Sequence, residues 1–289
     1  MGEILVGTAS WTDKTLLASG WYPPRAKTAE DRLRFYASKF PLVEVDATYY
    51  APPAERTACL WRDRTPEHFT FNVKAFSLLT GHPTRVASLY SDLRARVPAR
   101  TSVYLKDVAD EVVEEVWERF LSALWPLYEA GKLGALLFQF PPWFTVGERA
   151  RAYVLRVKER CAPVRVCVEF RNETWLSPES REATLEFLRR NDLAYVGVDM
   201  PQGYRSSVPP VLEATSDLAV VRFHGHSDEW DGGSVYDKFA YFYGEGELRW
   251  WAGRIRELSS RAETTHVVFN NCCADHSQRN AERMTELLA

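Results

Sequence analysis

Seven polar side chains lie at or just beyond the C-terminal ends of short apolar segments. They are Asp46, Lys74, Gln139, Glu169, Asp199, His224 and Asn270. Side chains of these types can move protons, hold anions, orient hydroxyl groups or bind a metal ion. If the ends of the segments meet at one place in the fold, these residues form a single site.

Two chemistries follow from the residue types alone. Asp46 and Glu169 can act as an acid and base pair on a polar substrate. Lys74 can form a Schiff base with a carbonyl if its pKa is depressed. The neighbouring acids oppose that second chemistry, because they favour the charged ammonium.

A metal site is the third chemistry that these residues allow, with Glu169, Asp199 and His224 as ligands. His224 and His226 are an i, i+2 pair on a predicted loop and need not converge, and the sequence contains no H-E-x-x-H motif. Arginine and lysine side chains in the neighbouring segments would crowd the same place with positive charge. We therefore predict no bound metal and no cofactor.

Eight apolar segments must position these side chains, and helix-like stretches lie between most of them. The segments begin near Ile4, Leu42, Phe69, Gly134, Val164, Leu193, Leu218 and Thr265. Eight strands that alternate with helices predict an α/β fold, a single (β/α)8 TIM-type barrel of eight parallel strands. Barrels of this kind carry their active sites at the C-terminal ends of the strands.

The alternation of side chains along these strands predicts a polar barrel interior. In LVEVDAT, for example, Glu44 and Asp46 share the face opposite Val43 and Val45. The same reasoning places Asn72, Arg165 and Arg222 inside the barrel with Glu44. Two interpretations remain open for these deeper residues, a self-neutralising ion network and a ligand site.

Helix and loop signals complete the predicted topology. Thr28 with Asp31 predicts a capping box, Asp107 a cap for the long helix that follows it, and Ser177-Pro178 another helix start. The last two helices are expected over 248–258 and 281–288. The connections 76–106 and 225–247 are longer than a barrel needs and predict binding loops. A short or irregular helix is expected within 200–217.

Composition bounds the class of protein. A chain of 289 residues with 46% hydrophobic residues suits one barrel domain over 1–289. The net charge of −3 disfavours non-specific binding to nucleic acid. The sequence shows neither a membrane-spanning run nor a signal peptide, and its five cysteines form no C-x-x-C pair. We expect a cytoplasmic protein; the oligomeric state is not predicted.

Several motifs together resemble the domain of unknown function 72 (DUF72) family, also called YecE-like. They are VGTASWTDKTL with GWYPP, VEVDATYYAPP, FNVKAFSLLTGH, GALLFQFPPWF, VCVEFRNETW, VVRFHGH and VVFNNCCADHSQRNA. The resemblance implies a (β/α)8 barrel and brings no established reaction. The barrel of this family is similar to that of endonuclease IV, which implies a DNA-related role as an alternative function. Family-like positions coincide with the site proposed above: Glu44, Asp46, Lys74, Glu169, Arg171, His224, Asn270 and Asn271.

The functional expectation is an enzyme, a hydrolase or an isomerase, that does acid/base chemistry on a sugar or phosphorylated compound. Glu169, Asp46 and Lys74 are the catalytic candidates. The substrate-binding candidates are Glu44, Gln139, Arg171, His224, Asn270, Asn271, Trp11 and Tyr49. A nucleic-acid-binding or repair protein, using the basic 76–106 stretch, is the first alternative. A non-catalytic metabolite-binding protein is the second.

Overall fold

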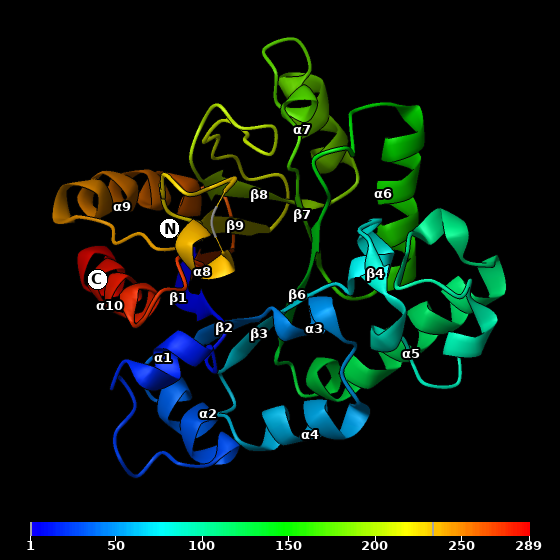
Figure 1. The fold of residues 1–289 in the computed structure, drawn as a ribbon. Coiled ribbons are helices and arrows are strands. Elements are labelled where there is room, and N and C mark those ends of the chain that lie inside the picture. The colour runs from blue at the N-terminus through cyan, green and yellow to red at the C-terminus, as the bar shows by residue number, and fades with distance from the viewer. Residues whose placement is uncertain (1, 233) are drawn as a thin grey trace.

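Eight strands close into an all-parallel barrel in the order β1-β10-β9-β8-β7-β6-β3-β2. The computed structural model describes residues 2–232 and 234–289 (Figure 1). The barrel strands are β1 (Glu3–Ala9), β2 (Leu42–Val45), β3 (Thr70–Lys74), β6 (Leu133–Gln139), β7 (Val166–Glu169), β8 (Ala194–Asp199), β9 (Leu218–Phe223) and β10 (Thr264–Phe269). All eight strands fall in the segments that the sequence predicted, so the (β/α)8 barrel is confirmed.

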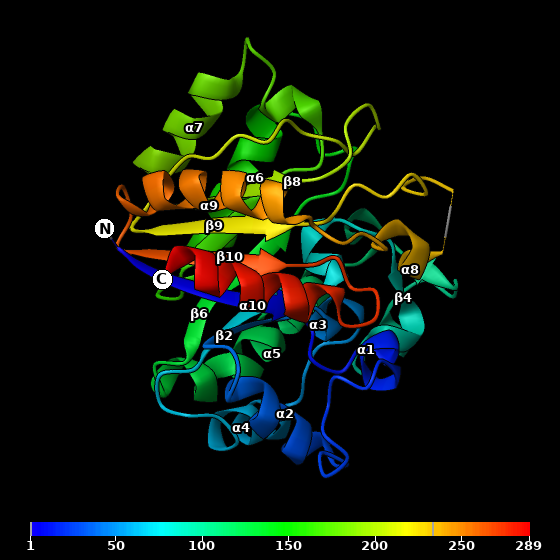
Figure 2. The same cartoon turned by 90° about the vertical axis from the view of Figure 1, so that its left-hand side faces the viewer.

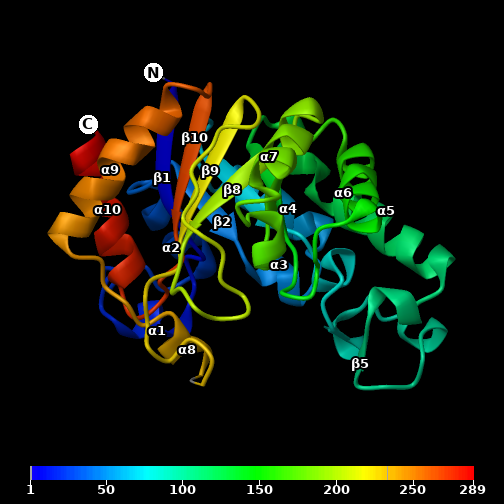
Figure 3. The same cartoon turned by 90° about the horizontal axis from the view of Figure 1, so that it is seen from above.

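Helices surround the barrel and connect successive strands (Figure 3). They are α1 (Lys14–Ala18), α2 (Ala29–Ala37), α3 (Ala47–Tyr50), α4 (Glu55–Asp63), α5 (Asp110–Glu129), α6 (Glu148–Cys161), α7 (Arg181–Arg190), α8 (Val235–Lys238), α9 (Glu245–Ser259) and α10 (His276–Leu288). Figure 2 shows α1, α8 and β4 beyond the C-terminal ends of the strands, which is the end where the candidate site lies.

The local capping signal at the start of α2 is confirmed, whereas the predicted starts of α5 and α7 are wrong. The capping box of Thr28 and Asp31 is present at the start of α2. Asp107 caps a short 3₁₀ turn, whereas α5 begins after Ala109. Helix α7 begins after Ser180, and the Ser177 hydroxyl lies 3.1 Å from that of Ser180. In both cases the side chain of the predicted cap residue forms its hydrogen bond within a turn that precedes the helix.

The long connection after β3 folds into an excursion beyond the barrel. It contains 3₁₀ turns at Ser77–Thr80, Val86–Ser88, Arg94–Arg96 and Leu105–Asp107. A two-stranded antiparallel sheet, β4 (Thr84–Arg85) with β5 (Ser102–Val103), closes it. The described part of the 225–247 connection contains α8 and, from Glu245, the start of α9, whereas Gly233 lies outside the described residues. Residues 200–217 run without a helix, contrary to the prediction, because prolines and serines dominate there.

The main apolar core lies between the strands and the surrounding helices, while the barrel interior holds polar side chains beside a small apolar cluster of Ala9, Leu42 and Val268. Val43 and Val45 belong to the core, and Glu44 between them is fully buried on the other face. Arg165 was expected inside the barrel and is not there. Strand β7 starts only at Val166, so the Arg165 guanidinium lies at the N-terminal rim, 45% exposed and 3.0 Å from Asp217.

No helix in the described part of the chain is long and apolar enough to cross a membrane. Among the same residues, all five cysteines are unpaired.

Candidate functional site

Arg222 is the centre of a polar network that spans the barrel interior. It extends from β9, and its Nη2 donates to Glu44 Oε1 on β2 at 2.5 Å. Its Nη1 donates to Glu169 Oε2 on β7, also at 2.5 Å. All three side chains are fully buried. A buried arginine requires partners of this kind, because an unpaired charge there is very unfavourable.

Glu169 uses both of its oxygen atoms within this network. Gln139 Nε2 donates to Oε1 at 2.8 Å, and Arg171 Nε donates to the same atom. Burial alone would raise the pKa of Glu169, but the charges of Arg171 and Arg222 outweigh it and hold that pKa well below its usual range. Glu169 is therefore an ionised carboxylate without a free lone pair facing solvent.

His224 is a neutral ring that is fixed at both nitrogen atoms. Burial and the nearby Arg171 lower the pKa of His224 well below its usual value. Arg171 Nη2 lies 2.9 Å from Nε2 and can only donate, so Nε2 is the acceptor. On the other side of the ring, Asn270 Nδ2 lies 2.9 Å from Nδ1.

Lys74 and Asp46 form the part of this site that reaches solvent. Their side chains are 13% and 23% exposed, and Lys74 Nζ lies 3.7 Å from Asp46 Oδ1. Arg222 Nη2 lies 3.8 Å from the same oxygen. Both separations exceed hydrogen-bonding distance. Oδ1 is itself buried and has no hydrogen-bond partner among the described residues, so the exposed part of the Asp46 side chain is not this oxygen. A small polar ligand that enters here would meet the Lys74 ammonium group and the exposed part of the Asp46 side chain.

Aromatic rings extend from this pair along the rim. Lys74 Nζ lies 4.8 Å from the centre of the Tyr49 ring. Tyr49 contacts His82 at 5.3 Å between ring centroids, and His82 contacts Trp143 at 5.9 Å. Burial, with Lys74 and Arg171 nearby, lowers the pKa of His82 to about 3, so this imidazole is neutral. Sequence reasoning missed His82, which lies in an irregular loop without a periodic signal.

Glu44 has different hydrogen-bond partners and a different pKa shift from Glu169, although both are fully buried and both contact Arg222. Two Arg222 nitrogen atoms donate to Glu44 Oε1, whereas Oε2 has no partner among the described residues. Burial outweighs the attraction of Arg222 and raises the pKa of Glu44 to about 7, with Asp46 contributing in the same direction. Glu44 is thus partly protonated near neutral pH.

A second polar group lies at the ends of β8 and β9. Asp199 accepts from Tyr243 Oη at 2.6 Å and lies 2.9 Å from His226 Nε2. Asn271 was expected to orient a ligand, but its Nδ2 donates to Tyr241 O and to Asn280 Oδ1, both at 2.9 Å. These bonds fix the 241–243 segment, which makes Asn271 a framework residue.

The structure therefore divides the predicted site residues into two groups. One network contains Glu44, Asp46, Lys74, Gln139, Glu169, Arg171, His224 and Asn270, with Arg222 at its centre and Tyr49 at its edge. Asn271 and Trp11 lie outside it. Trp11 is 8% exposed and packs edge-on against Trp61 at 5.9 Å.

Metal ligands do not gather in the described part of the chain, where no group of three or more His, Cys, Asp or Glu side chains could hold an ion. His224 faces Glu169 inside the barrel, whereas His226, 41% exposed, pairs with Asp199. The basic 76–106 stretch is partly neutralised, since Arg96 pairs with Glu115 at 2.6 Å. Arg94 Nε donates to the Leu89 carbonyl at 3.0 Å.

A closed parallel barrel with a polar network at its C-terminal mouth is the architecture of a barrel enzyme or binding protein. The comparisons with known proteins define the family more closely. Residues 5–289 match the sequence model of the family described as protein of unknown function DUF72. The chain belongs to this family, as its motifs indicated.

Relatives with the same architecture support this membership. The chain is 33% identical to the UPF0759 protein YunF of Bacillus subtilis, over 99% of this chain and 94% of that one. A crystal structure of a DUF72 family protein from Thermotoga maritima matches with a TM-score of 0.79 and 28% identity, covering 99% of each chain. Another, from Enterococcus faecalis, has a TM-score of 0.80 and 26% identity, covering 99% and 95%.

Proposed function

We propose that this protein is an enzyme that does acid/base chemistry on a small, hydroxyl-rich or anionic ligand at the C-terminal mouth of the barrel. The observation that carries the proposal is the Asp46–Lys74 pair. It combines a carboxyl side chain that is 23% exposed with an ammonium group 3.7 Å from its Oδ1. A base needs a free lone pair within reach of the substrate, and an adjacent cation stabilises the negative charge that develops on the substrate.

Asp46 suits proton transfer better than Glu169 does. Glu169 is fully buried, and Arg171, Arg222 and Gln139 occupy its oxygen atoms. A carboxylate with a strongly lowered pKa is also a weak base. Glu169 instead holds Arg171 and Arg222 in fixed positions. Asp46 is the base in this proposal, Lys74 is the electrostatic partner, and Glu169 is a positioning residue.

The charge balance at the mouth favours a ligand with hydroxyl or acidic groups. Three cations, Lys74, Arg171 and Arg222, lie with the carboxyl groups of Asp46, Glu169 and Glu44. Because Glu44 is partly protonated near pH 7, the cations are not fully balanced. A sugar phosphate offers an anion for this excess and hydroxyl groups for Asp46, which makes it the first substrate class to test.

The test is a turnover screen of the purified protein against sugar phosphates and glycosides. For any substrate found, Asp46→Asn should lower kcat by about 10²- to 10⁴-fold, because it removes the base. Its thermal midpoint should change little, because Oδ1 has no hydrogen bond to lose. Glu169→Gln should instead lower the thermal midpoint strongly, since it leaves two buried guanidinium groups short of a counter-charge.

Unchanged kcat in Asp46→Asn would remove Asp46 from the mechanism. The non-catalytic alternative predicts a different pattern, in which a sugar phosphate raises the thermal midpoint without turnover. In that case Lys74→Ala should abolish the stabilisation while the protein remains folded.

A further inference from the structure

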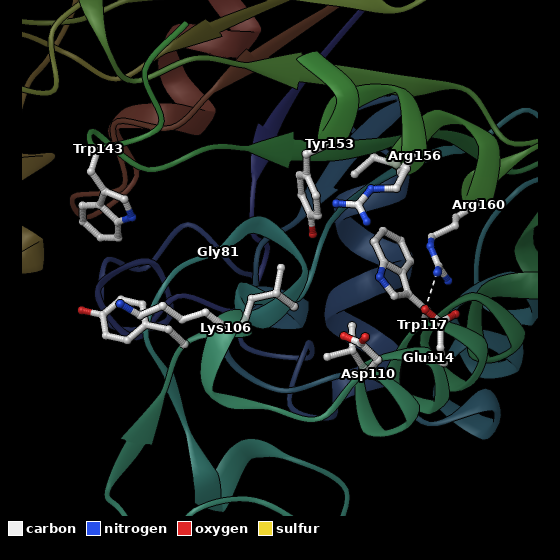
Figure 4. Close-up of a pocket in the computed structure, with 13 residues that line it drawn as sticks. Gly81, Lys106, Asp110, Glu114, Trp117, Trp143, Tyr153, Arg156 and Arg160 are labelled. Atoms are coloured by element: carbon white, nitrogen blue, oxygen red, sulfur yellow. Dashed lines mark hydrogen bonds and ion pairs between the residues drawn. The ribbon is translucent and has the colours of Figure 1, made fainter. Parts of the chain in front are cut away.

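A cavity of about 640 Å³ lies outside the barrel, between α5, α6 and the 77–107 excursion (Figure 4). Pockets of this size hold small organic ligands. Its lining includes Trp143, Tyr104, Lys106, Asp110, Tyr153 and Arg156. None of the residues of the Arg222 network belongs to that lining, and the cavity meets the rim of the barrel at Trp143, whose ring contacts His82.

One end of the cavity is aromatic. The side chains of Trp143 and Tyr104 are 47% and 40% exposed, and their rings meet edge-on at 6.4 Å. Figure 4 shows Trp143 and Lys106 together on one side of the cavity. Lys106 Nζ lies 5.9 Å from the centre of the Tyr104 ring. Half-exposed indole and phenol rings favour the face of a planar ligand, because stacking removes apolar surface from water.

The other end carries a cation without an acidic partner. Arg160 is neutralised by Glu114, to which it donates. Arg156 packs over Tyr153 with 5.3 Å between its guanidinium carbon and the ring centroid, and it forms no ion pair among the described residues. Figure 4 shows Arg156 beside Tyr153 across the cavity from Trp143. Its guanidinium is thus available for a phosphate or carboxylate, which it can bind with two hydrogen bonds.

We propose that this cavity is a second binding site, for a compound that joins a planar ring to one anionic group, as a nucleoside monophosphate does. The ring packs against Trp143 and Tyr104, and the anionic group binds Arg156. Asp110, which also lines the cavity, can accept a hydrogen bond from a hydroxyl group of the ligand. This site does not depend on the chemistry proposed for the barrel mouth.

Isothermal titration calorimetry with adenosine monophosphate tests the proposal. We expect one equivalent to bind, with adenosine and inorganic phosphate each binding at least about tenfold more weakly, because each keeps only one of the two contacts. Absence of binding by adenosine monophosphate at millimolar concentration would overturn the proposal. Equal binding of inorganic phosphate would also overturn it, because the ring would then contribute nothing.

Matched variants locate the site. Arg156→Ala should weaken adenosine monophosphate binding by about tenfold or more, whereas Arg149→Ala, which removes an exposed arginine from the first turn of the same helix, should not. Trp143→Ala should weaken binding, while Trp250→Ala, a half-exposed tryptophan on α9, should leave it unchanged. Loss of binding in Asp46→Asn with full binding in Arg156→Ala would place the nucleotide in the barrel mouth and refute the second site.

Discussion

At the scale of residues, three carboxylates near one arginine have three different environments. Glu169 accepts hydrogen bonds on both oxygen atoms, and Glu44 accepts them on Oε1. Among the described residues, neither Glu44 Oε2 nor Asp46 Oδ1 has a hydrogen-bond partner. Burial raises the pKa of Glu44, whereas Arg171 and Arg222 lower the pKa of Glu169, although the two residues are of one type. The side chain with the fewest partners is therefore the candidate for chemistry, and the one with the most is a positioning residue.

The raised pKa of Glu44 predicts a specific pH dependence of stability. Its pKa rises from 4.5 to about 7 on folding, so the folded protein holds this proton more tightly than the unfolded chain does. The resulting stabilisation is fully present below about pH 4.5 and is lost as the pH rises through about 7. It amounts to at most about 3 kcal/mol. Glu44→Gln, which cannot ionise, should lack this contribution to the pH dependence.

Urea unfolding at pH 5 and pH 8 measures this effect. The loss of unfolding free energy between the two pH values should be smaller in Glu44→Gln than in the unsubstituted protein. Glu118→Gln, which changes an exposed glutamate on α5, should behave like the unsubstituted protein. Equal pH dependence in Glu44→Gln and the unsubstituted protein would contradict the assignment.

At the scale of elements, Asn280 on α10 is a buried link between that helix and the 225–247 connection over the barrel. Asn280 is 1% exposed, accepts from Tyr243 N at 3.1 Å and donates to Tyr243 O at 3.0 Å. Asn271 after β10 donates to the same Asn280 oxygen. Tyr243 in turn donates to Asp199, so this contact also orients the His226–Asp199 pair.

Asn280→Ala should release this segment while the barrel stays folded. The variant leaves buried backbone groups of Tyr243 without partners, which is expected to lower stability by about 1–3 kcal/mol. Hydrogen exchange should increase within 225–247 and remain unchanged in β1 and β2. Thr285→Ala, which changes an exposed residue of the same helix, is the control. An equal increase in hydrogen exchange in 225–247 and in β1 and β2 of Asn280→Ala would argue against a local role for Asn280.

At the scale of the whole molecule, the distribution of charge predicts the metal content. Lys74, Arg171 and Arg222 surround the acidic groups at the mouth and oppose a further cation there. Protein purified without chelator should contain less than one tenth of an equivalent, roughly, of zinc, manganese or iron. Elemental analysis gives this number directly. One equivalent of any of these metals would contradict the prediction and favour phosphoester hydrolysis with a metal-bound water.

The sequence by itself determined the barrel and the end of it that carries the site. Strand segments such as LVEVDAT carry their own period of two, and the parallel topology brings their C-terminal ends together. That reasoning selected Asp46, Lys74 and Glu169 correctly as neighbours of one network. It failed for Arg165, which lies one residue before its strand and so faces the rim.

Only the tertiary structure decided which of these residues are free to act. Arg222 contacts Glu44 across 178 positions of the chain and Glu169 across 53. Glu169 also contacts Arg171, so its pKa is lowered, whereas burial raises the pKa of Glu44. Asn270 and Asn271 are adjacent in sequence, yet one bonds to His224 and the other to the 241–243 segment. Access and protonation depend on neighbours within a few ångströms, and the fold brings those neighbours from distant parts of the chain.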